Sequence, residues 1–232
     1  MKRQHHLVTV ACAITPLLGC GLEARAAAVI LSPASATASS TTPSGPYGGY
    51  GIENTINQSG LSEKFNSGMT NFDAYIARNP THTKTAPGKE WFGSLGTYSA
   101  VVDYELDAVI SIDKFALWNE ESSGIGVFDL WASVDGVSYT EILTATAPPD
   151  NPPFLDYSAS VFSFPVVSAK YLRLNLSSCP QPDPGSYKSC SIGEVAFSAP
   201  VVAVPAPVPV LGAAAFFGWA RTIRRKMKSR VD

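Results

Sequence analysis

His82 is the residue on which histidine-based catalysis in this chain would depend. The sequence of 232 residues has three histidines, and the other two stand at positions 5 and 6, inside a predicted leader. A general base needs a partner within hydrogen-bond reach, and the run 79–83 supplies no evident orienting group. The sequence also lacks a G-x-S-x-G elbow, a P-loop, H-E-x-x-H and C-x-x-C. It therefore predicts a protein that is not an enzyme, with an unrecognised glycosidase pair among its acids as the alternative.

Cys179 and Cys190 are predicted to form a disulfide. They are the only cysteines expected in the mature chain, and they stand eleven positions apart around a Pro-rich loop. Export into an oxidising compartment favours such a bond, which closes a loop this short and stabilises the fold by about 2 to 3 kcal/mol.

Export is predicted from the first 26 residues. Lys2 and Arg3 precede an apolar run at 7–18, and the small residues at 24–26 form a cleavage site, so 1–26 is expected to be a signal peptide. The run 17–20 also fits a bacterial lipobox with Cys20 as the lipid acceptor, which is the alternative route. Both routes take the chain out of the cytoplasm.

The C-terminus has three parts in order. Prolines at 205, 207 and 209 favour an extended linker over 200–209, an uncharged stretch predicts one hydrophobic helix at 210–220, and a basic tail follows at 221–232. Eleven helical residues span only about 16 Å, but the uncharged run that starts at Val201 is long enough to cross a bilayer. The basic tail would then remain cytoplasmic.

This arrangement resembles the PEP-CTERM sorting signal of exported bacterial proteins. The resemblance rests on Pro205-Ala206-Pro207 and on the basic end that begins with Arg221, Arg224 and Arg225. It implies an exosortase-type processing enzyme as a partner, anchoring in the inner membrane before processing, and later display on the cell surface or in the extracellular matrix. The family motif has Glu where this chain has Ala206, and a permanent single-pass anchor is the alternative.

The segment between the two ends is acidic and rich in short strand-like runs. Residues 27–218 carry 17 acidic and 8 basic side chains, which argues against nucleic acid as a partner. Apolar residues alternate over 128–134, the turn Asp135-Gly136 follows, and 139–143 supplies a return strand. Further runs follow at 101–106, 109–112, 115–119, 161–164, 171–176 and 192–197. This pattern predicts an all-β, antiparallel sandwich over 29–199.

Several of these runs resemble discoidin domains, the coagulation-factor C-type domains with a galactose-binding-like fold. Asp135-Gly136 with Tyr139 resembles their S-x-D-G-x-x-W hairpin, and 169–174 resembles their A-R-Y-V-R-L strand. Residues 192–197 resemble the closing I-A-E-L-E-V strand, while 102–106 and 53–58 stand where the family has V-D-L-G and A-x-N-A-I-D-G. The resemblance implies a jelly-roll β-sandwich with an insertion between Gln58 and Trp91 that contains a short helix at 72–77.

The same resemblance implies a structural calcium ion between the first loop and the closing strand. Glu194 matches the family's strand carboxylate, and Asn57 stands at the position of the loop aspartate. Ser62 or backbone carbonyls would complete the oxygen ligands. The alternatives are a salt bridge for Glu194 and a turn-capping role for Asn57.

Ligand binding is predicted from aromatic side chains without a core position. Period two turns Trp131 outward, where it is either a sugar platform or a surface covered by the insertion at 59–90. In the resembling family, loops at one end of the sandwich contact sugars or lipid head groups. The loop candidates here are Tyr50, Tyr75, Arg78 and His82.

These observations predict an exported, surface-sorted, non-catalytic protein that binds extracellular polysaccharide in a sheath or biofilm matrix. A structural matrix protein without a discrete ligand is the first alternative, and an envelope glycoside hydrolase is the second. The sequence does not identify the sugar or the oligomeric state.

Overall fold

The computed structural model describes residues 27–42 and 49–200. The predicted signal peptide, the linker beyond residue 200, the hydrophobic segment and the basic tail lie outside these residues. Within the described part of the chain, no helix has both the length and the apolar character needed to cross a membrane.

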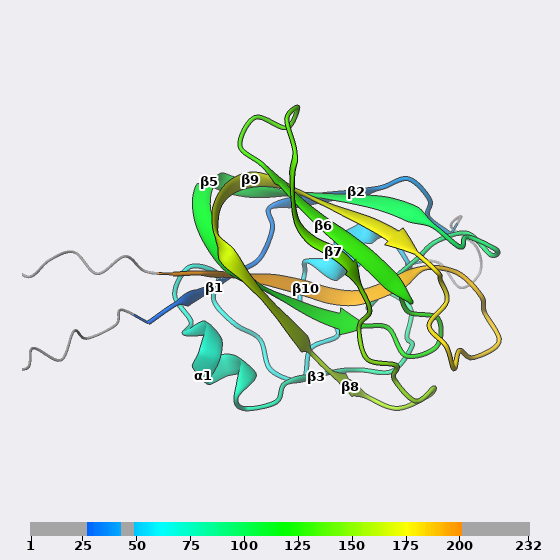
Figure 1. The fold of residues 1–232 in the computed structure, drawn as a ribbon. Coiled ribbons are helices and arrows are strands. Elements are labelled where there is room, and N and C mark those ends of the chain that lie inside the picture. The colour runs from blue at the N-terminus through cyan, green and yellow to red at the C-terminus, as the bar shows by residue number, and fades with distance from the viewer. Residues whose placement is uncertain (1–26, 43–48, 201–232) are drawn as a thin grey trace, which may run out of the picture.

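The described chain is almost entirely antiparallel β-structure with two short helices (Figure 1). The helices are η1 (Ile52–Thr55) and α1 (Phe72–Ile76). The strands are β1 (Val29–Leu31), β2 (Ser35–Ala38), β3 (Thr81–His82), β4 (Trp91–Phe92), β5 (Ala100–Asn119), β6 (Val127–Ser133), β7 (Thr140–Thr146), β8 (Tyr157–Ser158), β9 (Ser160–Ser177) and β10 (Ser191–Ala199). The hydrogen-bonded order is β1-β10-β5-β9-β6-β7, with β2 on β5, β4 on β10, and β3 paired separately with β8.

Two long strands, β5 and β9, run through both layers of the sandwich. The first half of β5 pairs with β2 and with the end of β9, whereas its second half pairs with β10 and with the start of β9. The register shifts between Glu105 and Ile110, which is where both strands bend on the side from which the termini leave (Figure 1). The predicted antiparallel β-sandwich is therefore confirmed.

The main core lies between the two layers and follows from the alternation along the strands. Phe115 is at its centre and packs its ring against Phe128, Phe162 and Phe197, with centroids 5.7, 6.2 and 5.2 Å away. All the inward residues of β6, such as Leu130, are buried. The alternation of side chains between the two faces of each strand thus determines which residues enter the core.

A second apolar cluster covers the outer face of the β5–β10 layer. The insertion 58–90 lays Phe72 and Tyr75 of α1 against Trp118, whose indole N–H donates to the carbonyl of Pro80 at 3.0 Å. Helix α1 begins where the Asn71 side chain accepts the N–H of Ala74 at 2.7 Å. The short helix was predicted correctly, but the insertion covers Trp118 rather than Trp131.

Candidate functional site

Four loops meet at the end of the sandwich farthest from the termini, at 83–99, 120–126, 147–156 and 178–190. We call this the distal end; it lies where β10 begins, whereas the other end of β10 pairs with β1 (Figure 1). Gln181 joins three of the loops, because its backbone N–H donates to Ser123 O at 2.6 Å and its side-chain amide donates to Asn151 O at 2.7 Å. Gly93, in the loop 83–99, donates its N–H to Cys190 O at 2.9 Å, which joins this fourth loop to the other three.

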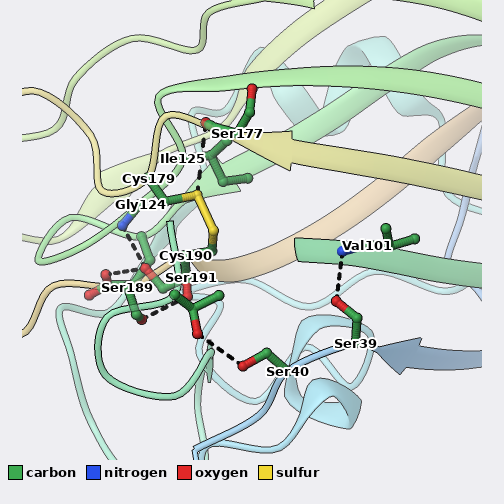
Figure 2. Close-up of a disulfide and its surroundings, with 12 residues drawn as sticks. Ser39, Ser40, Val101, Gly124, Ile125, Ser177, Cys179, Ser189, Cys190 and Ser191 are labelled. Atoms are coloured by element: carbon green, nitrogen blue, oxygen red, sulfur yellow. Dashed lines mark hydrogen bonds between the residues drawn. A yellow bond between two sulfur atoms is a disulfide. The ribbon is translucent and has the colours of Figure 1, made fainter. Parts of the chain in front are cut away.

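The predicted disulfide between Cys179 and Cys190 is confirmed and lies at the distal end (Figure 2). The backbone N–H of Cys179 donates to Tyr98 O at 3.2 Å, and that of Cys190 donates to Thr97 O at 2.9 Å. Beside the bond, Gly124 N–H donates to the Ser191 hydroxyl. The covalent link therefore fixes the loop that carries Tyr98 against the start of β10.

Three aromatic rings form an edge-to-face group at the distal end. Tyr50 and Tyr187 lie 5.0 and 5.6 Å from the buried Phe92, at interplanar angles of 76° and 80°. Tyr50 and Tyr187 are half-buried, and in the adjoining loop Tyr98 is 60% exposed and Leu95 is 68% exposed. Burial, together with the charges of Glu90 and Glu120, raises the pKa of the Tyr50 hydroxyl. These two carboxyl groups therefore lie close to the Tyr50 ring.

The buried acidic cluster was not predicted from the sequence. Glu120 and Glu121 follow β5 directly and are excluded from solvent, and Glu90 approaches from the loop before β4. Glu120 accepts N–H groups of Ser122 and Ser123 at 3.0 and 2.6 Å. The available signal was a pair of acids at a strand end followed by two serines and a glycine.

His82 lies beside this cluster and is also fully buried. Its Nδ1 is 2.8 Å from Thr83 O and 3.6 Å from Glu90 Oε1, while Nε2 has no partner. Burial lowers the pKa of His82, and burial followed by the charges of Glu120 and Glu121 raises the pKa of Glu90 to about 9. A buried imidazole offers no surface to a ligand, which corrects the prediction that His82 contacts one.

These buried carboxyl groups also bear on the hydrolase alternative. Glu90, Glu120 and Glu121 meet in one place and two of them have raised pKa values, which is a common property of catalytic acids. All three side chains are, however, closed to solvent. A polysaccharide cannot reach them in this conformation.

The other predicted ligand residues lie in separate places. Tyr75 is buried and its hydroxyl donates to Glu63 O at 2.6 Å, so it is not available to a ligand. Arg78 is exposed near α1 and forms an ion pair with Glu63 at 2.7 Å. Of the five predicted residues, Tyr50 and the buried His82 lie at the distal end, and of these two only Tyr50 is partly exposed.

Trp131 is half-buried on an outer face of the sandwich, as the alternation predicted. This face belongs to the second layer, which consists of β2, the first half of β5, the end of β9, β6 and β7. Trp131 lies in a row across four strands, between Arg173 and Glu141, and Arg173 pairs with Asp103 at 2.7 and 3.1 Å. The guanidinium of Arg173 also lies 4.5 Å from the ring centre of Tyr139. Arg173 and Asp103 therefore satisfy each other within the protein, whereas the Trp131 indole N–H has no partner.

The residues proposed for calcium lie at different depths in the structure. Asn57 and Ser62 are exposed and their oxygens accept local N–H groups of Ser59 and Thr81 at 2.8 and 2.9 Å, whereas Glu194 is buried. No hydrogen bond joins either side chain to Glu194, and within residues 27–42 and 49–200 no three His, Cys, Asp or Glu residues could hold a metal.

Glu194 instead lies against the backbone of the first loop. Its Oε2 accepts the N–H of Gln58 at 2.8 Å, and its Oε1 has no partner. Burial raises the pKa of Glu194 well above its usual value, although the Gln58 N–H and Lys64 oppose this.

Comparison with known proteins gives a likeness of shape only. No protein-family model matches the chain, and no curated protein matches it. A chitosan-binding module of a chitosanase/glucanase from Paenibacillus sp. IK-5 is similar at 16% identity and a TM-score of 0.45, over 72% of this chain and 95% of that one. A CBM32 module from Clostridium perfringens, in complex with GalNAc-β-1,3-galactose, has 16% identity and a TM-score of 0.45, over 70% and 93%. At these scores, no ligand and no residue role passes from those proteins to this chain.

Proposed function

We propose that this chain is a non-catalytic glycan-binding protein whose binding surface is the distal end. The observation that carries the proposal is the aromatic group of Tyr50, Phe92 and Tyr187, together with the exposed Tyr98 in the same loop as Phe92. Aromatic faces pack against the C–H surfaces of sugar rings, while nearby polar groups bind hydroxyls.

The rigidity of this end supports the same function. The Tyr187 hydroxyl donates to Gly93 O at 3.3 Å, and the Ser123 hydroxyl donates to Tyr187 O, so both ends of the residue are held. The disulfide restrains the loop that contains Tyr187. A surface fixed before binding loses less conformational entropy when a ligand is bound.

The charge of the chain favours one class of glycan. Residues 27–218 carry 17 acids against 8 bases, so a polyanionic polysaccharide would be repelled. The preferred ligands are therefore uncharged glycans or glycans that contain amino sugars, rather than uronic-acid or sulfated polymers.

The proposed setting is the outside of a bacterial cell. The signal peptide, the PEP-CTERM-like tail and the basic end support export, anchoring in the inner membrane and exosortase processing for display on the surface or in a matrix. In that setting, a module that binds polysaccharide would attach the protein to sheath or biofilm material.

A glycan array with the full-length protein tests the proposal. We expect saturable binding to a neutral or amino-sugar glycan, which is lost in Tyr98→Ala and kept in Met69→Ala, an exposed apolar control outside the distal end. Folded protein that binds no glycan would instead favour the structural matrix role.

A further inference from the structure

Glu120 and Glu121 share a single hydroxyl group, that of Thr85. Thr85 Oγ1 lies 2.7 Å from Glu120 Oε1 and 2.9 Å from Glu121 Oε1. Both glutamates are fully buried, and the second oxygen of Glu121 has no partner. A threonine hydroxyl has one proton, so it can donate to only one of the two carboxyl groups.

The remaining contacts show which group receives that proton. Glu120 accepts two backbone N–H groups, from Ser122 and Ser123, and the hydroxyl of Ser191 at 2.7 Å. Glu120 is thus surrounded by donors and acts as a carboxylate, whose bond from Thr85 completes the set. Glu121 Oε1 accepts the Thr85 N–H at 3.1 Å and the Ser122 hydroxyl at 2.9 Å, but Glu121 Oε2 has no partner, so Glu121 is the less completely solvated of the two carboxyl groups and the one that holds a proton. The 2.9 Å contact between Thr85 Oγ1 and Glu121 Oε1 is favourable when that proton lies between the two oxygens.

No positive charge replaces this proton. The groups that face the pair are Glu90 from the loop before β4, His82 of β3, Tyr157 of β8, Tyr50 and Lys89. Burial keeps His82 neutral, and Lys89 Nζ donates to Ser59 O at 2.7 Å. Burial and the neighbouring Glu121 raise the pKa of Glu120 to about 8.

The pair lies where the loops of the distal end are joined. Thr85 belongs to the loop 83–99, both glutamates belong to 120–126, and Ser191 begins β10. Gln181, from the fourth loop segment, donates its side-chain amide to Glu121 O at 2.6 Å. A second negative charge here would repel the first in a site closed to solvent and would weaken these connections.

We propose that Glu120 and Glu121 hold one shared proton through Thr85, and that this proton is a pH-sensitive latch on the distal loops. The latch is closed at acid and neutral pH and opens as alkaline pH removes the proton. The latch itself stands independently of glycan binding; only its effect on affinity rests on the proposed function.

The stability of the full-length protein against denaturant tests the latch. In the unfolded chain both carboxyl groups ionise, so unfolding releases the shared proton, and this raises the unfolding constant about tenfold per pH unit between pH 6 and 8. Glu121→Gln removes the proton donor while keeping its size and should remove that factor from the pH dependence. Glu63→Gln is the matched control, because Glu63 is exposed and should leave the dependence unchanged.

Glu120→Gln separates the two members of the pair. Its amide group would place N–H atoms against a backbone N–H of Ser122 or Ser123, so we expect a lower stability at every pH. The carboxyl carbons of ¹³C-labelled glutamates give a direct measurement: besides the signals of Glu90 and Glu194, the pair contributes one protonated signal at pH 7, which is absent in Glu121→Gln.

An unchanged pH dependence in Glu121→Gln, or two fully ionised signals for the pair at pH 7, would overturn the latch. Glycan affinity that falls above pH 8 in the wild type and not in Glu121→Gln would support it. If no glycan binds at any pH but the pH dependence changes as expected, the latch stands and the proposed function fails.

Discussion

The hydroxyl of Tyr157 lies directly against Gly193, so that a β-carbon at position 193 would overlap the tyrosine oxygen. Both residues are buried, and the hydroxyl has no hydrogen-bond partner. Gly193→Ala should therefore lower the free energy of unfolding by about 1 to 3 kcal/mol, measured by denaturant titration. Tyr157→Phe removes the oxygen and should restore most of that loss in the double variant; a double variant as unstable as Gly193→Ala would exclude this contact as the cause.

Loss of the disulfide should affect both stability and the binding surface. Replacing Cys179 and Cys190 by Ser should lower the free energy of unfolding by about 2 to 3 kcal/mol, because the unfolded chain is no longer restrained. Glycan affinity should fall too, since the loops that carry Tyr98 and Tyr187 lose their covalent link. Reduced wild type is the matched comparison, and equal stability before and after reduction would contradict the expectation.

Local sequence patterns predicted the features that depend on neighbouring residues. The hairpin around Asp135-Gly136 and the outward face of Trp131 follow from alternation, and the disulfide follows from export and spacing. The predicted runs 101–106, 109–112 and 115–119 are one strand, β5. Alternation breaks at the exposed residues 107–109, where the strand bends while the ladder continues.

The features that were missed depend on contacts between distant segments. His82 was predicted to lie in a loop, but pairing of β3 with β8 buries it beside Tyr157. Glu90 and Glu120 come together only because loops thirty positions apart pack at one end of the sandwich. No periodicity in the sequence reports such a contact.

Chelation of calcium should leave the stability of the protein unchanged, because the side-chain oxygens of Asn57 and Ser62 accept N–H groups of Ser59 and Thr81 and form no hydrogen bond with Glu194. The unfolding midpoint should be the same with added Ca²⁺ and with EDTA. Glu194→Gln should be neutral or stabilising at pH 8, since an amide oxygen can still accept the Gln58 N–H and no carboxyl proton need be retained. A midpoint raised by Ca²⁺ in the wild type and not in Glu194→Gln would show that the ion binds after all.

Glu90 should make the fold less stable as the pH rises. Its pKa is about 9 in the folded protein and near 4.5 in the unfolded chain, so its contribution to stability is fully present below pH 4.5 and is lost towards pH 9. Glu90→Gln should therefore be more stable than the wild type at pH 8, by about 1 kcal/mol or more. Comparing the two proteins between pH 7 and 9 separates this effect from His82, because the ordinary pKa of His82 already lies below this range and burial lowers it further; parallel stability curves for the two proteins would contradict it.

Titration calorimetry with the glycan selected on the array tests the central claim most directly, using full-length wild type, Tyr98→Ala and Trp131→Ala. A distal-end site predicts that Tyr98→Ala weakens binding by at least about tenfold, roughly 1.4 kcal/mol, while Trp131→Ala binds like the wild type. Loss of binding in Trp131→Ala alone would place the site on the outer face of the second layer and contradict the account.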